Sequence, residues 1–291
     1  MDWFKPLSPV ISVFLLITIG FFFARWRKIS LAPLTEFIVY LAAPCLVFTS
    51  LTTKPLFAAD IAVILAGALG IIGGVGLLIW LYSLLFHFSS PGFVLSLLFM
   101  NAGNMGIPLA LFAFGEAGLQ RATLFFVIMS CLQYSLGIYI LSGKGGWKEI
   151  FRLPLIYATL LGLFFNVTQI SVPEPIFKPL WLLGYSTIPL MLVSLGYRLH
   201  DIQSLTWGHS FGGALIRILG GLASAYIIVT VLGIQGINRQ VILLYGSLPS
   251  AVINFVLTEK YRQDPELAAS IIFLTTLFSF VTIPVVLWLI L

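Results

Sequence analysis

The stretch Asn101-Ala-Gly-Asn-Met-Gly-Ile-Pro108 lies inside a hydrophobic segment and cannot continue an ordinary α-helix. Pro108 has no main-chain N–H and cannot bond to the carbonyl of Asn104, while Gly103 and Gly106 add backbone freedom beside it. Polar main-chain groups left open in hydrocarbon are strongly unfavourable. The stretch therefore predicts a helix break where protein, water or a ligand supplies the missing partners.

The composition around this break is that of a polytopic membrane protein. Of the 291 residues, 60% are hydrophobic and 9% are charged, against about 25% charged in soluble domains. The net charge of +5 comes from basic residues scattered singly in short loops, and these form no stripe for nucleic acid. Cys45 and Cys131 lie far apart in apolar runs, so we expect neither a disulfide nor a metal site. No cofactor is expected.

Hydropathy over a window of about 19 residues predicts about ten membrane spans, separated by short polar connections. No connection is long enough to hold a soluble domain. The spans are expected at residues 10–24, 31–51, 61–86, 92–114, 119–141, 153–170, 179–196, 211–232, 241–257 and 267–291.

The basic residues predict the orientation of these spans. With the N-terminus outside, nine Lys and Arg residues fall in inner loops and five in outer loops. The inner set is Arg25, Arg27, Lys28, Lys144, Lys148, Arg152, Arg198, Lys260 and Arg262, and the outer set is Lys5, Lys54, Arg121, Lys178 and Arg239. The positive-inside rule then predicts a multi-pass protein of the plasma membrane with both termini outside.

The two halves of the chain resemble each other at an offset of about 145 residues. Ala43-Pro44 aligns with Ile188-Pro189, Gly67 aligns with Gly212, and Asn104 falls opposite Pro249. With five spans in each half, the second half is inverted, which is the pattern of secondary transporters. We therefore expect an all-α membrane protein of two inverted five-helix repeats, residues 1–145 and 146–291, whose fourth and ninth helices are broken.

These motifs resemble the auxin efflux carrier family, which includes plant PIN-type auxin carriers and bacterial permeases linked to malate or malonate. The resemblance spans nearly the whole chain and rests on Asn101, Met105-Gly-Ile-Pro108, Ile188-Pro189, Leu195-Gly196, Leu248-Pro249, Asn254 and Glu259-Lys260-Tyr261. It implies the ten-helix fold of bile-acid sodium symporters, with crossing broken helices, a scaffold and a panel that rock past each other, and a carboxylate bound at the crossing. The long cytoplasmic loop of many plant members is absent, with only residues 142–152 in its place. Because of this departure, neither regulation through such a loop nor auxin as the substrate can be carried over from the plant proteins.

Candidate substrate contacts follow from the chemistry of the two breaks. Neutral carboxamides at Asn101, Asn104 and Asn254 can donate to a carboxylate without placing fixed charge in the membrane. Ser247 and Ser250 are further candidates, and helix N-termini after the breaks can face the anion. Gly103, Gly106, Pro108 and Pro249 are the predicted hinge residues. The alternative is that the Asn side chains cap helix ends and the Ser hydroxyls bond back to their own helix.

Energy coupling is less constrained by the sequence. A sodium ion could bind carbonyls freed at the breaks, those of Asn104 and Tyr245, helped by Gln133, Thr275 or Thr276. No acidic residue is expected at mid-depth, which argues against a titrating carboxylate. Arg217 is expected to reach the membrane interface rather than substrate. Uniport of an anion driven by the membrane potential is favoured over sodium or proton symport.

The predicted function is a secondary transporter that moves a small organic anion, auxin-like or malate/malonate-like, by alternating access, in the direction of export. An anion channel is the remote alternative and would need a continuous polar stripe across several spans. No enzyme motif such as HExxH or GxSxG occurs. The lipid bilayer and the organic anion are the expected partners. The sequence does not decide whether the chain forms a homodimer.

Overall fold

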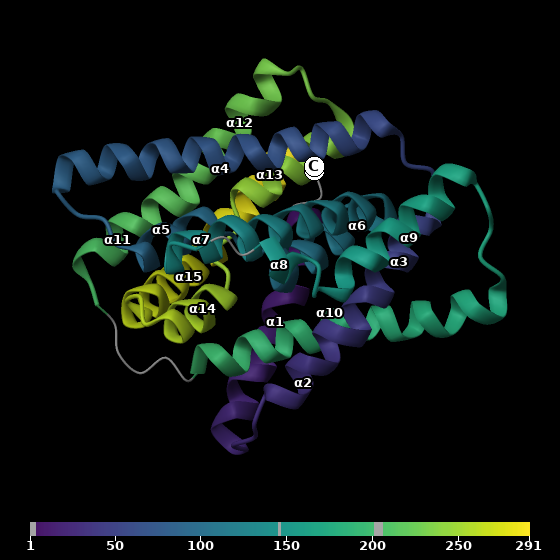
Figure 1. Cartoon of the computed structure of the whole chain (residues 1–291), viewed down its shortest axis with the longest axis horizontal. Coiled ribbons are helices and arrows are strands. Elements are labelled where there is room, and N and C mark those ends of the chain that lie inside the picture. The colour runs from purple at the N-terminus through teal and green to yellow at the C-terminus, as the bar shows by residue number, and fades with distance from the viewer. Residues whose placement is uncertain (1–3, 145–146, 201–205) are drawn as a thin grey trace.

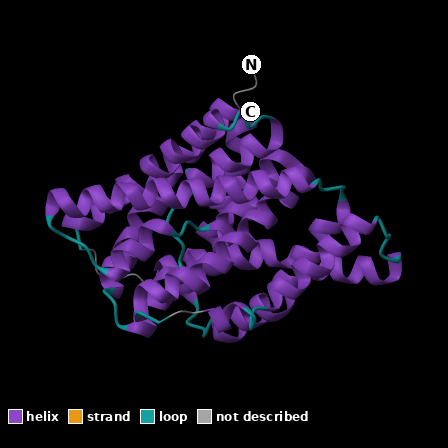
Figure 2. Cartoon of the chain, turned by 45° about the horizontal axis from the view of Figure 1, so that its top comes forward, coloured by secondary structure: helices purple, strands orange, loops and turns teal. Residues whose placement is uncertain are grey.

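The computed structural model describes residues 4–144, 147–200 and 206–291, and the regular structure in these ranges is helical (Figure 2). No strand occurs in them, although an isolated antiparallel bridge joins Met100 and Ser250. Seven of the described helical segments are long and apolar enough to cross a membrane. The prediction of an all-helical membrane protein is therefore confirmed for the class of fold.

Several helices begin at start signals in the sequence. The Oγ of Ser90 accepts a 3.2 Å hydrogen bond from the N–H of Phe93, and Pro91 occupies the first turn of α5 (Pro91–Leu98). Proline also begins α9 (Pro154–Thr168) and α15 (Pro265–Ile290). Local chemistry thus fixes these three boundaries before any tertiary contact forms.

One set of helices packs mainly on itself and is called the first helix group here. Within it α1 runs along α10, and α3 packs against both α9 and α10. The approach of α1 to α10 requires glycine, because a Cβ on Gly20 or Gly196 would overlap the facing main chain. Besides α9, the first helix group comprises α1 (Phe4–Trp26), α2 (Ala32–Phe37), the π-helical turn η1 (Ile38–Ala42), α3 (Ala43–Thr53) and α10 (Glu174–His200).

The other helices form the second helix group, in which α4 packs on α12 while α15 packs on α11 and α14. Figure 1 shows α4, α12 and α13 on one side of the molecule and α1, α2 and α10 on the other. A short helix, α8 (Trp147–Ile150), lies in the connection between the two halves of the chain. The second group comprises α4 (Ala58–Phe86), α5, η2 (Ala102–Gly106), α6 (Ile107–Leu132), η3 (Gln133–Gly137), α7 (Ile138–Ser142), α11 (Gly208–Leu215), η4 (Ile216–Gly220), α12 (Gly221–Val231), α13 (Gly236–Gly246), α14 (Ile253–Tyr261) and α15.

A kink inside α6 replaces the loop predicted between residues 114 and 119. Gly115 has φ +65° and ψ −156°, a conformation that only glycine adopts readily, so the helix changes direction there without a separate connection. The helical stretch consequently runs from Ala102 to Ser142. The predicted fourth and fifth spans are joined at this kink.

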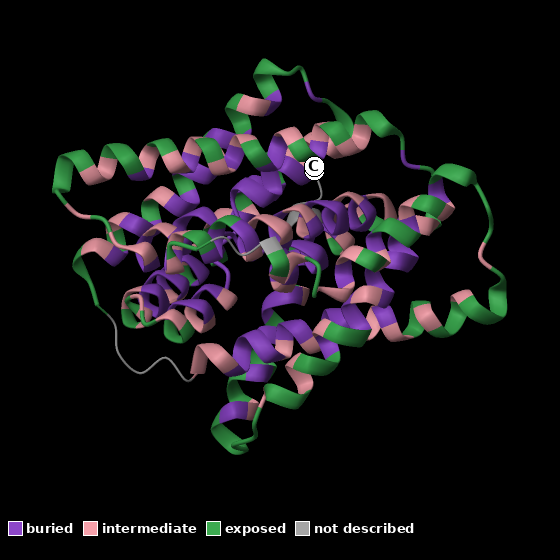
Figure 3. Cartoon of the chain, viewed as in Figure 1, coloured by how far each residue is buried: buried purple, intermediate pink, exposed green. Residues whose placement is uncertain are grey.

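Burial is high in α5, α6 and α15, and the long helix α4 carries many exposed apolar residues (Figure 3). In α5, Leu95 and Leu97 are fully buried, whereas Leu77, Trp80 and Leu85 on α4 are more than half exposed. Large apolar side chains exposed along whole helices are typical of a surface that contacts lipid.

Candidate functional site

Two interrupted helices meet in the second helix group. Helix α5 ends at Leu98, and the backbone is non-helical at Phe99 (φ −104°, ψ 107°) and Asn101 (φ −74°, ψ 62°) before η2 begins at Ala102. Helix α13 ends at Gly246, and α14 begins at Ile253. The sequence predicted interruptions in both of these regions.

The first interruption begins earlier than the sequence indicated. Gly103 and Gly106 lie in the π-helical turn η2, and Pro108 lies in the first turn of α6. Up to Gly106 this run is therefore not regular α-helix, whereas Ile107 and Pro108 already belong to α6. Pro249 lies inside the second interruption, between α13 and α14. A hinge role for these four residues stays a prediction.

The two interruptions satisfy each other's main-chain groups. The N–H of Asn101 donates to the carbonyl of Pro249 at 2.7 Å, and the N–H of Ala251 donates to the carbonyl of Phe99 at 3.0 Å. Lipid offers no hydrogen bonds, so an unpaired break would be costly at membrane depth. We call this paired region, residues 99–101 with 249–251, the crossing. Its paired main-chain groups need no ligand as a partner.

Asn254 holds the crossing together from α14. Its Nδ2 donates to the carbonyl of Phe99 at 2.9 Å and to Ser250 Oγ at 3.1 Å, and its Oδ1 accepts from Gln133 Nε2 at 2.6 Å. The N–H of Ser250 in turn donates to Thr275 Oγ1 at 3.1 Å. Four residues predicted separately as substrate or cation contacts, Gln133, Ser250, Asn254 and Thr275, thus form one buried network.

Three other predicted residues bond to nearby main chain. Ser247 Oγ donates to the carbonyl of Leu244 at 2.7 Å, and Thr276 Oγ1 donates to that of Ile272 at 2.7 Å. The hydroxyl of Tyr245 lies 2.8 Å from the carbonyl oxygen of Ala122 and 3.2 Å from that of Ala102. Substrate roles for Ser247, Ser250 and Asn254, and a cation site at Tyr245, Gln133, Thr275 and Thr276, stay predictions.

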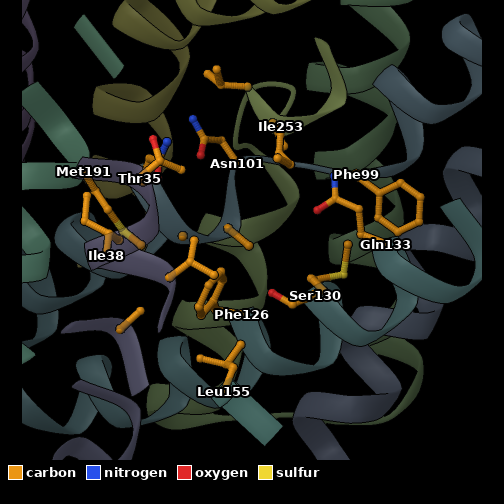
Figure 4. Close-up of a pocket in the computed structure, with 18 of the residues that line it drawn as sticks. Thr35, Ile38, Phe99, Asn101, Phe126, Ser130, Gln133, Leu155, Met191 and Ile253 are labelled. Atoms are coloured by element: carbon orange, nitrogen blue, oxygen red, sulfur yellow. The ribbon is translucent and has the colours of Figure 1, made fainter. Parts of the chain in front are cut away.

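A cavity of about 180 Å³ lies between the two helix groups, beside the crossing. Figure 4 shows Thr35 and Met191 of the first group around it with Asn101, Phe126 and Ile253 of the second. Its volume is below the range of about 300–1,000 Å³ typical of pockets for drug-sized ligands, so it suits a small solute. Both Asn101 and Asn104 line it, whereas Ser247, Ser250 and Asn254 do not.

Two polar atoms that belong to residues lining this cavity lack partners. Asn101 Nδ2 and Ser194 Oγ are both buried, and neither forms a hydrogen bond within the described structure. A buried polar group without a partner is destabilising by about 1–3 kcal/mol. Both groups can donate, so an acceptor that reaches them would remove this penalty.

Arg198 is the one charged residue among those described around the cavity. It belongs to the last turns of α10, and its Nη2 donates to Thr35 Oγ1 at 3.0 Å. The sequence analysis assigned Arg198 to an inner loop and missed Ser194. Their spacing is the signal that could have found them, because Met191, Ser194 and Arg198 recur every three to four residues on one helix face.

Arg217 contradicts the sequence-based prediction. It is 0% exposed, and its Nη1 and Nη2 donate to the carbonyls of Leu97 and Gly246 at 2.9 and 3.0 Å. The expectation that it reaches the membrane interface is therefore wrong. Two main-chain acceptors in the protein interior replace the water that an interfacial position would have offered.

An apolar helical chain with a solute-sized cavity beside two paired helix breaks has the architecture of a membrane transporter. The chain belongs to the membrane transport protein family, whose sequence model matches residues 6–149 and 142–287. This is the auxin efflux carrier family that the motifs indicated, so that recognition is confirmed.

Relatives agree with this family. The chain is 30% identical to an uncharacterized transporter of Methanocaldococcus jannaschii, over 98% of this chain and 99% of that protein. It is 26% identical to a protein of Rhizobium meliloti named as a candidate malonate transporter, over 97% of this chain and 94% of that protein. It is 24% identical to auxin efflux carrier component 3a of Oryza sativa, over 44% of this chain and 22% of that protein. These names indicate a transporter rather than an enzyme.

Proposed function

We propose that this protein is a carrier that moves a small organic anion across the membrane by alternating access, with the anion bound in the cavity between the two helix groups. The observation that carries this proposal is the unpartnered donor Asn101 Nδ2, which belongs to a helix break and lines a cavity together with Arg198. A carboxylate matches both groups, because it accepts hydrogen bonds and carries the opposite charge.

The remaining lining favours an anion with an apolar body. Phe126, Met129 and Met191 line the same cavity, while Asn104 and Ser194 supply further neutral polar groups. Arg198 alone supplies a full charge there. Related proteins are named for malonate transport and auxin efflux, and both names refer to small carboxylates. The apolar part of the lining suits an acid with an apolar body.

The position between two separately packed helix groups supports alternating access. A rotation of one group against the other would open the cavity to one side of the membrane and close it on the other. The crossing is tied within the second group by the Asn101–Pro249 and Phe99–Ala251 hydrogen bonds, so it would move as part of that group. A channel is disfavoured because the lining is mostly apolar.

We propose that the chain crosses the membrane ten times as two inverted repeats, residues 1–145 and 146–291. Contacts between the ends of different helices support this path. At one side Asn238 Nδ2 donates to Asp60 Oδ1 at 2.7 Å, and Gln240 Nε2 donates to the carbonyl of Ile290 at 2.8 Å. At the other side the N–H of Ile29 donates to Tyr197 Oη at 2.8 Å.

The positive-inside rule supports an orientation with the Ile29–Tyr197 side in the cytoplasm and both termini outside the plasma membrane. The cavity is lined by Thr35, Pro154 and Arg198, which lie close to the ends of α2, α9 and α10 on that side. An anion would then enter from the cytoplasm, as export requires. The membrane potential favours outward movement of one negative charge by about 2.3 kcal/mol per 100 mV, so uniport needs no coupling ion.

A ligand screen on the purified chain tests the function. Thermal unfolding in detergent, measured with mono- and dicarboxylates, should show stabilisation by at least one acid, with a larger shift for acids with an apolar body. Proteoliposomes should then show saturable uptake that is stimulated by the same acid on the opposite side, which a channel cannot do. Flux that rises linearly with concentration and lacks this counterflow would reject a carrier.

A further inference from the structure

Arg217 is a buried cation whose partners are two helix ends. It lies in η4 between α11 and α12, and its guanidinium bridges the carbonyl of Leu97, in the last turn of α5, to that of Gly246, the last residue of α13. These are the half-helices that end at the two breaks. One side chain therefore ties together the two half-helices that end at the interruptions.

The charge of Arg217 is balanced by these helix ends. No carboxylate forms an ion pair with it in the part of the chain that the structure describes, and its Nε has no hydrogen-bond partner there. The C-terminus of a helix carries roughly half a negative elementary charge, so two such ends supply roughly the one unit that a guanidinium needs. A buried charge without such compensation would be strongly destabilising.

The surrounding chain leaves room for the guanidinium through two glycines. A Cβ on Gly221 would overlap Arg217 Nη2, and a Cβ on Gly246 would lie 2.5 Å from Ala225 Cβ and 2.7 Å from the carbonyl oxygen of Gly221. Glycine at both positions allows α12 and α13 to approach closely while the arginine reaches between them. The arrangement is a fitted site for one monovalent cation.

We propose that Arg217 is the built-in cation of the crossing, and that it occupies the position where freed carbonyls would otherwise bind an exchangeable ion such as sodium. Carbonyl oxygens at interrupted helix ends are ligands for alkali cations in transporters. Here the guanidinium of Arg217 binds the carbonyls of Leu97 and Gly246 instead. In the proposed carrier sodium consequently does not bind at these two carbonyls, and this consequence rests on the proposed function.

Removal of the guanidinium tests the site without any substrate. Thermal unfolding of the full chain in detergent should show the same Tm for wild type in sodium, potassium or choline chloride. Arg217→Ala should lower Tm in choline by roughly 5–10 °C, because it leaves buried carbonyls unpaired. Millimolar guanidinium chloride, far below denaturing concentrations, should recover at least half of that loss, and sodium should recover more than choline.

The control is Arg152→Ala, since Arg152 is exposed and pairs with Glu149 at 2.9 Å on the surface. This variant should show no response to guanidinium or sodium. If Arg217→Ala does not accumulate, Arg217→Gln removes the charge but keeps donors for the carbonyls, and its Tm should rise more in sodium than in choline. Equal Tm values of the folded neutral variant in sodium, guanidinium and choline would overturn the proposal. A wild-type protein that no acid stabilises would count against the carrier instead, and the ion responses would still be measurable.

Discussion

The main-chain N–H of Asn101 donates a 2.7 Å hydrogen bond to the carbonyl of Pro249, so two helix breaks far apart in the sequence complete each other. This pairing explains how non-helical backbone is tolerated in an apolar chain. It uses the main chain of Asn101 and leaves the side-chain Nδ2 without a partner. The residue therefore serves the fold with one group and is available to a ligand with the other.

Asn101→Ala should weaken anion binding without destabilising the empty protein. A hydrogen bond to a charged group contributes about 1.5–3 kcal/mol, so its removal should raise Kd by roughly 10- to 150-fold. The Tm without ligand should stay the same or rise slightly, since the substitution removes an unsatisfied buried donor. Calorimetric titration with the best acid checks the first result, and thermal unfolding checks the second. Unchanged affinity would remove Asn101 from the site.

Asn254→Ala should have the opposite pattern. It removes the donors to Phe99 and Ser250 and the acceptor of Gln133, so we expect a loss of about 2–3 kcal/mol of stability, or roughly 5–10 °C in Tm, with or without ligand. Thermal unfolding measures this loss. A normal Tm combined with lost ligand binding would instead support the substrate contact predicted from the sequence.

Arg198→Gln should lower affinity for the anion by roughly tenfold or more, because it removes the one charged group described around the cavity. Ser194→Ala should give a smaller loss, since a neutral hydroxyl contributes about 0.5–1.5 kcal/mol. The matched control is Arg152→Gln, which removes an exposed arginine that is not among the residues lining the cavity. Comparable affinity in Arg198→Gln and this control would show that the cavity does not hold the carboxylate.

Pro108→Ala should slow transport while leaving anion binding intact. The new N–H can bond to the carbonyl of Asn104, which would convert the π-helical turn η2 to regular α-helix and stiffen this stretch. Counterflow in proteoliposomes should fall several-fold. Pro284→Ala is the control, because Pro284 lies inside the continuous helix α15 and does not line the cavity. Wild-type flux in Pro108→Ala would mean that this turn has no part in the transport cycle.

Cysteine labelling should establish the orientation. In a Cys45→Ser, Cys131→Ser background, Lys144→Cys should react with a membrane-impermeant maleimide only after permeabilisation. Gly233→Cys, in the exposed turn between α12 and α13, should react in intact cells. The reverse pattern would invert the orientation that the basic residues predict.

Sequence patterns were sufficient to predict the membrane class, the approximate position of most helices, the two interrupted regions and the family. These properties follow from local chemistry: hydropathy sets the spans, and proline, glycine and serine set the helix starts and breaks. The exact residues of the first break were not predictable, because a π-helical turn absorbs Gly103 and Gly106 and moves the interruption back to Phe99.

Only the tertiary structure decided which polar groups face each other. Asn101 and Asn254 look equivalent in sequence, yet the first borders a cavity and the second is saturated by Phe99, Ser250 and Gln133. Arg217 is buried because two helix ends converge on it, and Arg198 borders the cavity because its face of α10 meets the crossing. The physical reason is that hydropathy and propensity act along one segment, whereas the partner of a polar group depends on which helix faces meet.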